Sequence, residues 1–327
     1  MCCKIVNLTF NFIFFNVKNY LYILIFVVFI GCSKQEKITN AGIEMQNFVV
    51  NICQYCRSIK PNFILIPQNG IEVCFENIDP LGQINQNYIN SIDAVGVEEL
   101  FYNGKYLPDD YRIDMLTRVV KHKSIMVSEQ VENKNEIARA YELNQNEGFL
   151  CFVRDKNNYY YEHIPDTIVN SNNNDITKMS DVKNFLYLIG GGKGSDKLSF
   201  LNSIASTNYD LVIIDLFFDD IALNSDDLNR IKYKANGAKR LIIAYMSIGS
   251  AEKYRYYWQS NWRKGNPSFI AKSYKGYPDE YWVKFWDKDW QNIIYGNDNS
   301  YVKKIIDAGF DGVFLDNIGA YYFLYKN

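Results

Sequence analysis

Short apolar runs alternate with segments of helical spacing along most of the chain. Near the C-terminus, Tyr301–Ala308 has apolar positions at helical spacing and is followed by the apolar run Val313–Leu315. Gly309 is a natural end for this helix, because glycine readily adopts the left-handed conformation of a C-cap. Asp316 then stands at the carboxyl end of a buried strand. Helix, turn, strand and carboxylate together predict one unit of an α/β fold.

The same pattern predicts further units on both sides of a polar segment, residues 166–182, which is rich in Asn and lacks an apolar period. This segment is the expected linker. The other expected strands are 63–66, 94–102, 124–131, 148–153, 185–189, 209–217, 241–248 and 281–286, and the expected helices include 42–59, 114–120, 133–143, 195–205 and 226–235. Strands that alternate with helices predict parallel pairing. A single-domain (β/α)8 TIM barrel over residues 41–327 explains this pattern better than an open doubly wound sheet.

Acidic residues recur where the expected strands end. They are Glu98, Glu129, Asp215, Glu252 and Asp316. In a barrel the carboxyl ends of all strands converge on one mouth. Five carboxylates gathered there repel one another unless a substrate or cation intervenes, which favours a functional site. The alternative is that some of them cap the helix that follows.

The N-terminus has the pattern of an export signal. Lys4 and Lys18 precede the apolar run 20–31, which has the length of a signal-peptide core and is short for a membrane span. The following Cys32 and polar residues resemble a bacterial lipobox, in which the cysteine thiol takes a diacylglycerol. We therefore expect a signal peptide over 1–32, a tether over 33–40 and a lipid-anchored protein of the bacterial cell envelope. An uncleaved anchor or a plain secretory signal are the alternatives.

Composition excludes several other functions. A formal net charge of −2 gives no electrostatic case for nucleic acid. The 26 tyrosines suit sugar stacking, although core filling explains many of them. Cys53 and Cys56 form a C-x-x-C within a helical pattern, and no second close pair supplies a zinc site. We expect buried thiols and neither metal nor cofactor, and two histidines give little support to Ser–His chemistry.

Several stretches resemble glycoside hydrolase family 114, the endo-α-1,4-polygalactosaminidases. These are YDLVIID (209–215), AYMSIGSAEKYRYYWQSNW (244–262), YWVKFWDKDWQNII (281–294), GFDGVFLDN (309–317), FILIPQNG (63–70) and VGVEELFY (95–102). The resemblance implies a (β/α)8 barrel that hydrolyses an α-linked galactosamine-containing polysaccharide. The last two stretches stand first here, whereas the family places them after GFDGVFLDN, so the chain resembles a circularly permuted member.

The chain also departs from the family at the expected acids. Lys284 and Phe314 stand at the positions where the resemblance places catalytic carboxylates, and Gly319 stands where relatives carry a second Asp. A glycosidase needs one protonated and one ionised carboxyl group on either side of the scissile bond. We expect Asp316 as the ionised group and Asp215 or Glu252 as the acid. The separation of the two groups would decide between retention and inversion.

The expected sugar contacts lie at the same mouth. They are Tyr245, Arg255, Trp258, Gln68, Asn69, Glu98 and Glu129. A non-catalytic glycan-binding lipoprotein on the same scaffold is the main alternative function, and a purely structural or adhesive surface protein is a third. The glycan, the membrane and the oligomeric state stay open at this point.

Overall fold

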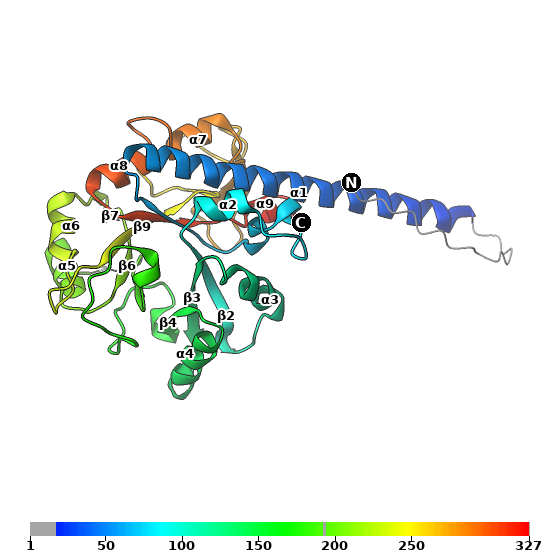
Figure 1. The fold of residues 1–327 in the computed structure, drawn as a ribbon. Coiled ribbons are helices and arrows are strands. Elements are labelled where there is room, and N and C mark those ends of the chain that lie inside the picture. Colours follow the sequence, from blue (N-terminus) through cyan, green and yellow to red (C-terminus); the bar gives the residue numbers. More distant parts are fainter. Residues whose placement is uncertain (1–17, 192–193, 327) are drawn as a thin grey trace.

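The structure is a computed structural model that describes the backbone of residues 18–191 and 194–326 and the side chains of residues 34–191 and 194–326 (Figure 1). The predicted signal peptide and lipobox, including Cys32, therefore lie outside the residues whose side chains are described. Among the helices of the described part, none combines the length and apolar character needed to cross a bilayer.

Two parallel sheets form the centre of the molecule. The larger has the order β1 (Ile64–Pro67), β13 (Gly312–Asp316), β9 (Leu241–Ser247), β6 (Leu211–Asp215) and β5 (Phe185–Tyr187). The smaller has the order β2 (Ala94–Tyr106), β3 (Ser124–Val131) and β4 (Leu150–Asp155). All neighbouring strands within these two sheets run parallel, as the sequence predicts.

The two sheets meet at both edges. A parallel bridge joins Gln68 to Gly96, and the Asn69 N–H donates to the Gly96 carbonyl at 2.8 Å. The edge strand β2 of the smaller sheet therefore lies beside the edge strand β1 of the larger sheet. At the other edge the rings of Phe152 on β4 and Phe185 on β5 lie 5.8 Å apart. The described residues of β4 and β5 form no hydrogen-bonded ladder. The fold is a mixed α/β arrangement of parallel strands, consistent with a TIM-like fold.

Helices surround these sheets (Figure 1). They are α1 (Lys18–Ile59), α2 (Gln86–Ser91), α3 (Asp110–Val119), α4 (Ile137–Asn146), α5 (Lys197–Ala205), α6 (Ser225–Ile231), α7 (Lys288–Ile294), α8 (Tyr301–Ala308) and α9 (Ala320–Phe323). Short 3-10 turns occupy Ile71–Cys74, Glu76–Ile78, Lys134–Glu136, Lys156–Asn158 and Met179–Asp181. As expected, α8 ends at Gly309, whose φ of 105° is left-handed.

Helix α1 begins much earlier than the predicted residue 42 and extends beyond the rest of the fold on its N-terminal side (Figure 1). Met45, Phe48, Val49 and Ile52 are fully buried, at the spacing of one helix face. The whole of the expected tether, residues 33–40, is helical. A short turn leads from α1 into β1, so α1 runs antiparallel to the strand.

One predicted strand lies outside the parallel sheets. The segment predicted over 281–286 forms β12 (Glu280–Val283), which pairs antiparallel with β10 (Ser250–Glu252) and β11 (Ile270–Ser273). A further small pair is formed by β7 (Phe217–Phe218) and β8 (Ile221–Ala222). The three-stranded antiparallel sheet follows β9 directly, so it places Glu280 beside the carboxyl ends of the parallel strands.

Aspartates anchor the amino ends of the strands. Asp93, before β2, accepts the Leu65 N–H of β1, and Asp311, before β13, accepts the Ile242 N–H of β9. Asp210, before β6, accepts the Lys183 N–H and forms a fully buried ion pair with Lys234 at 2.8 Å. The predicted linker is held at this end too, because Asn172 Nδ2 donates to Asp210 at 2.9 Å.

Phe314 fills the interior between two strands. Its side chain is 2% exposed, and its ring lies 5.2 Å from that of Tyr187. A Cβ atom at Gly96 would stand only 2.5 Å from this ring, so only glycine leaves room for it. The aromatic side chain at position 314 and the missing side chain at position 96 are therefore complementary.

Candidate active site

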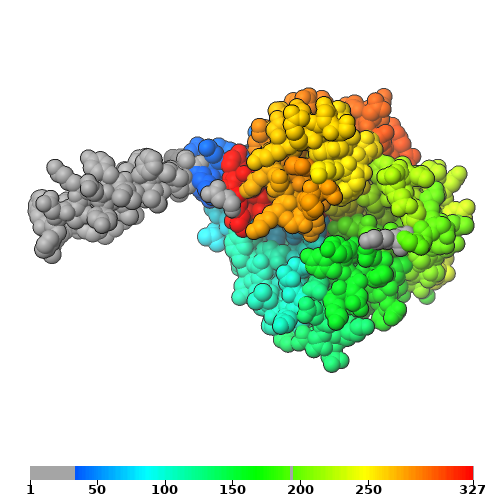
Figure 2. Space-filling view, turned by 180° about the vertical axis from the view of Figure 1, so that it is seen from behind, coloured from blue at the N-terminus to red at the C-terminus, as the bar shows by residue number. Residues whose placement is uncertain are grey.

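A pocket of about 1200 Å³ opens at the carboxyl ends of the parallel strands. Glu98 of β2, Asp215 of β6, Tyr245 of β9 and Asp316 of β13 all line it. The expected convergence of these side chains on one mouth is present in the structure. Figure 2 shows the yellow-to-orange region around residues 250–280 facing the green region around residue 160 on one side of the molecule.

Asp316 is held by two hydrogen-bond donors, and no cation among the described residues forms an ion pair with it. The Tyr245 hydroxyl donates to it at 2.5 Å, and the Asn317 N–H donates at 2.6 Å. Burial raises the pKa of Asp316 to about 7, the charge of Glu98 adds to this, and the Tyr245 hydrogen bond opposes it. Asp316 can therefore exchange a proton near neutral pH.

Arg255 binds the other two expected catalytic acids together. Its Nη1 lies 2.7 Å from Asp215 Oδ2, and its Nε lies 2.6 Å from Glu252 Oε2. Burial raises the pKa of Asp215, while the Arg255 charge opposes that rise. The Tyr254 hydroxyl also donates to Glu252 at 2.5 Å. Asp215 and Arg255 line the pocket, whereas Glu252 is 1% exposed and lies behind them.

Glu98 lies in a second group of polar side chains across the pocket. The Tyr161 hydroxyl donates to Glu98, and Arg154 lies between Glu98, at 3.9 Å, and Glu99, at 2.9 Å. Burial raises the pKa of Glu98 against the opposing effects of Tyr161 and Arg154. Asn69 supports this group, because its Oδ1 accepts the Glu98 N–H at 3.3 Å.

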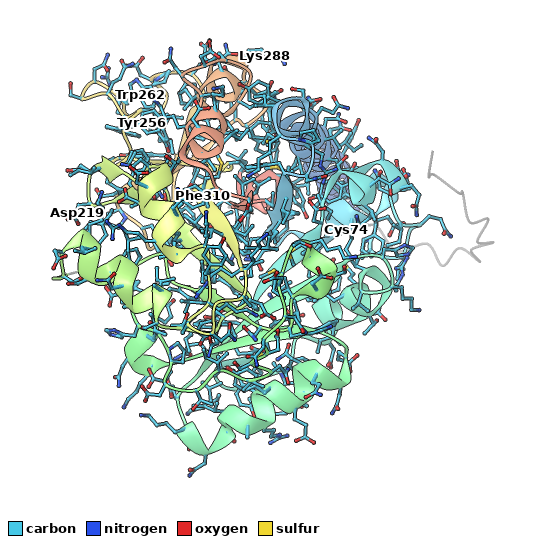
Figure 3. The ribbon with its side chains drawn as sticks, turned by 60° about the vertical axis from the view of Figure 1, so that its left-hand side comes forward. Cys74, Asp219, Tyr256, Trp262, Lys288 and Phe310 are labelled. Atoms are coloured by element: carbon cyan, nitrogen blue, oxygen red, sulfur yellow. The ribbon has the colours of Figure 1, made fainter. Side chains whose placement is uncertain are left out.

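Three expected sugar-binding residues do not line the pocket. Gln68 is 1% exposed and accepts a hydrogen bond from the Tyr187 hydroxyl at 3.3 Å, below the pocket. Trp258 packs on Tyr281, with ring centres 5.6 Å apart, and on Trp262 at 5.3 Å. This aromatic cluster includes the Trp262 and Tyr256 side chains labelled in Figure 3.

Glu129 is the third expected sugar-binding residue that does not line the pocket, and its carboxylate has partners inside the protein. It is fully buried and accepts the backbone N–H groups of Leu100, Phe101 and Tyr102 at 3.0 or 3.1 Å. Asn144 Nδ2 donates to it as well, at 3.0 Å. Glu129 therefore holds the bend of β2 and is separated from the pocket by the backbone that it binds.

The positions that the family resemblance links to acids lie in different places. Phe314 is buried beneath the pocket, as described above. Lys284 lies outside the pocket lining, and its N–H donates to the Phe269 carbonyl at 2.8 Å. Gly319 lines the pocket without a side chain to offer. The pocket acids therefore come from other positions.

Sequence reasoning missed most of the aromatic rim and five pocket acids, which are Glu72, Glu99, Asp109, Asp279 and Glu280. Glu280 lines the pocket, and burial, with the charge of Glu252, raises its pKa to about 8. The exposed or partly exposed rings around the opening are Tyr111, Tyr159, Tyr160, Tyr254, Tyr277, Tyr322 and Phe323. The available signal was the stretch 277–282, YPDEYW, where an acid stands among aromatic residues.

The described residues offer little else for bound ions. No group of three or more His, Cys, Asp or Glu side chains in the described part is arranged to hold a metal. Cys53, Cys56, Cys74 and Cys151 are free thiols, and the first three are buried; Cys74 is labelled in Figure 3. Burial raises the pKa of the Cys53 thiol, which makes it unreactive.

Comparison with known proteins points to one class, the glycoside hydrolases. A model of glycoside-hydrolase family GH114 matches residues 194–327, which contain Asp215, Glu252, Glu280 and Asp316. The C-terminal part of the chain is thus similar to this family.

The similar individual proteins are uncharacterized. The protein MJ1477 of Methanocaldococcus jannaschii is 32% identical over 158 residues, 45% of this chain and 44% of that protein. A Deinococcus radiodurans protein is 35% identical over 121 residues, 37% of each chain. A Thermotoga maritima protein is 31% identical over 118 residues, 36% of this chain and 35% of the relative. The chain thus spans less than half the length of these relatives.

Proposed function

We propose that this protein is a glycoside hydrolase whose reaction takes place in the pocket at the carboxyl ends of the parallel strands. The observation that carries the proposal is the Asp316 carboxyl group, which lies in a large pocket, has a pKa near neutrality and is paired with no cation of the described residues. Glycosidic hydrolysis needs carboxyl groups of this kind. The match of residues 194–327 to family GH114 supports the same reaction class.

The charge of the lining favours a basic sugar. The pocket acids are Glu72, Glu98, Glu99, Asp109, Asp215, Asp279, Glu280 and Asp316, whereas its cations are Arg112, Arg154 and Arg255. An excess of carboxylates attracts a cationic ligand and repels an acidic one. The substrate in this proposal is an α-linked polymer that contains galactosamine with free amino groups.

The rim favours a polymer over a single sugar. Tyr159, Tyr160 and Tyr277 stand at the opening with 45%, 65% and 43% of their surfaces exposed. Tyr322 and Phe323 of α9 add two more exposed rings. Aromatic faces can stack on successive sugar rings, which would hold a chain across the opening.

We further propose a permuted TIM barrel as the scaffold. The first strand, β1, pairs with the last, β13, and α1 supplies a helix before β1 although no strand precedes it within the described residues. The two ends of the chain thus complete one helix–strand unit together. The family match covers only residues 194–327, as expected if the remaining stretches occur in a different order.

The proposed setting is the cell envelope, with the protein anchored through Cys32. Because α1 runs antiparallel to β1, its N-terminal half points towards the carboxyl ends of the strands, where the pocket opens. On the face shown in Figure 2, the red C-terminal residues of the pocket rim lie beside the blue part of α1. An anchored protein would therefore hold its pocket near the membrane. If protease or label on intact membranes reached the pocket rim as readily as the opposite face, this orientation would be wrong.

The test of the hydrolase is the release of reducing ends from a panel of galactosamine polymers, with and without N-acetyl groups. Wild-type protein should cleave the deacetylated polymer, and Asp316→Asn should lose at least about 100-fold of that activity. Asp307→Asn is the matched control, because Asp307 is 57% exposed on α8 and pairs only with Lys303 in the described structure. Full activity of Asp316→Asn would exclude the proposed role of Asp316.

A non-catalytic glycan-binding protein is the second candidate. Its specific support is Phe314, a buried ring at a position where the family resemblance places an acid. This alternative predicts binding to the polymer without any new reducing ends.

A further inference from the structure

Glu280 occupies an unusual place in the antiparallel sheet beside the pocket. It begins β12 and stands directly opposite Glu252 of β10 in the strand register. Two like charges in directly opposite positions destabilise a sheet. Stability alone therefore does not favour an acid at this position. The Glu280 side chain lines the pocket, while Glu252 lies behind it.

The two opposed carboxyl groups differ in their partners. Glu252 accepts hydrogen bonds from Arg255 Nε at 2.6 Å and from the Tyr254 hydroxyl at 2.5 Å. Glu280 accepts one from Ser250 Oγ at 3.1 Å, and no ion pair within the described residues involves it. Arg255 is shared between Asp215 and Glu252, so its charge is already matched by these two carboxylates. Among the described residues, Glu280 has no such cationic partner.

Hydrogen bonds connect Glu280 to the residue next to Asp316. Ser250 Oγ, which contacts Glu280, lies 2.9 Å from Ser247 Oγ. Asn317 Nδ2 donates to both serines, at 3.1 and 3.0 Å. The Tyr274 hydroxyl donates to the oxygen of the same amide, Asn317 Oδ1, at 3.3 Å. The network fixes Glu280 relative to Asp316.

The backbone of Asn317 is strained in a way that serves this network. Its φ of 65° lies in the left-handed region, which residues with a side chain adopt rarely. The conformation turns the Asn317 amide towards Ser247 and Ser250 directly after the strand that carries Asp316. Strain of this kind tends to be retained where it positions reacting groups.

We propose that Glu280 is the general acid of the hydrolysis, an inference that rests on the proposed glycoside hydrolase function. Its carboxyl proton passes to the glycosidic oxygen as the bond between that oxygen and the anomeric carbon breaks. The electron pair of the broken bond stays with the oxygen, so the leaving sugar departs as an alcohol. The anomeric carbon gains the hydroxyl group of a water molecule, and the remaining proton of that water goes to the ionised Asp316 carboxylate.

The protonation states agree with these roles. Burial, with the charges of Glu252 and Asp316, raises the pKa of Glu280 to about 8. The pKa of Asp316, at about 7, is lower. Both carboxyl groups therefore have pKa values in the range that general acid–base catalysis near neutral pH uses. The Ser250 hydrogen bond lowers the pKa of Glu280, so this serine is a positioning residue.

The test compares two substrates in Glu280→Gln. A general acid is needed for a sugar leaving group but scarcely for dinitrophenolate, which departs without a proton. Glu280→Gln should therefore lose at least about 100-fold on the polymer and less than about tenfold on the dinitrophenyl glycoside of the same sugar. Glu142→Gln, an exposed position on α4, is the matched control and should retain both activities.

The pH profile gives a readout that a merely structural role would not move. Wild-type activity on the polymer should fall above about pH 8, and this fall should be absent from the residual polymer activity of Glu280→Gln. In Ser250→Ala that fall should shift to higher pH. Equal losses on both substrates, or no loss on the polymer, would overturn the role of Glu280 while leaving the hydrolase intact. If the wild type cleaves neither substrate, the proposed function is wrong, and this inference is wrong with it.

Discussion

Replacing Asp316 with Asn should change how the stability of the protein depends on pH. A free aspartate has a pKa of about 3.9. Burial and the charge of Glu98 raise that of Asp316 to about 7. The folded protein thus binds this proton more tightly than the unfolded chain does. The resulting contribution stabilises the fold below about pH 4 and is lost as the pH rises through about 7.

The magnitude follows from the size of that rise. Each pKa unit corresponds to about 1.4 kcal/mol, so the rise to about 7 is equivalent to roughly 4 kcal/mol. The Asp316 side chain is partly exposed, and solvent screening reduces the expected effect to about 2–4 kcal/mol. The amide that replaces the carboxyl group in Asp316→Asn has no proton to lose in this range. The free energy of unfolding of Asp316→Asn should therefore rise relative to the wild type by this amount between about pH 4.5 and pH 9.

Urea unfolding followed by tryptophan fluorescence measures this difference at each pH. Asp307→Asn serves as the control, since an exposed ion pair such as that of Asp307 with Lys303 contributes little to stability. A constant offset in Asp316→Asn would reflect altered hydrogen bonds to Tyr245 and Asn317. Parallel stability curves for wild type and Asp316→Asn across the whole pH range would refute the assignment of a raised pKa to Asp316.

Three other predictions concern the scaffold and the rim. Lys234→Met removes the cation from the fully buried Asp210 and should lower the free energy of unfolding by about 3–5 kcal/mol. Lys303→Met, at an exposed ion pair, should change the free energy of unfolding little, and equal effects of the two variants in denaturant titrations would contradict this prediction. Gly96→Ala brings a Cβ to 2.5 Å from the Phe314 ring and should lower the free energy of unfolding by about 1–3 kcal/mol. Adding Phe314→Leu in a double variant should restore most of the lost stability. Tyr160→Ala, at a 65% exposed rim ring, should weaken polymer binding by roughly 3- to 10-fold without loss of stability, whereas Tyr106→Ala, outside the pocket lining, should leave calorimetric affinity unchanged.

Hydrophobic pattern alone predicted much of the fold. The strand predicted over 124–131 and the helix predicted over 301–308 have the same bounds in β3 and α8. Buried parallel strands are nearly continuous apolar runs, so their positions can be predicted from the sequence. The segment 281–286 has the same composition but lies in an antiparallel sheet, because strand direction depends on neighbours that are distant along the chain.

The site was predictable only in part. The ends of β6 and β13 place Asp215 and Asp316 in the pocket, as their positions after apolar runs indicate. Glu129 has the same sequence signature but turns towards backbone N–H groups, a difference that local sequence does not encode. Glu280 follows no parallel strand and enters the pocket from the antiparallel sheet. Its role depends on the ion pairs that Arg255 forms with other acids, which only the folded structure reveals.

The most direct test of the account is hydrolysis of a deacetylated galactosamine polymer in water enriched in oxygen-18, with the products weighed by mass spectrometry. The account predicts one heavy oxygen at each new reducing end with the wild type, and at least about 100-fold fewer such ends with Asp316→Asn. Asp307→Asn should match the wild type. Polymer that stays intact from about pH 5 to pH 9, or undiminished labelling with Asp316→Asn, would contradict the claim that this pocket cleaves glycosidic bonds through Asp316.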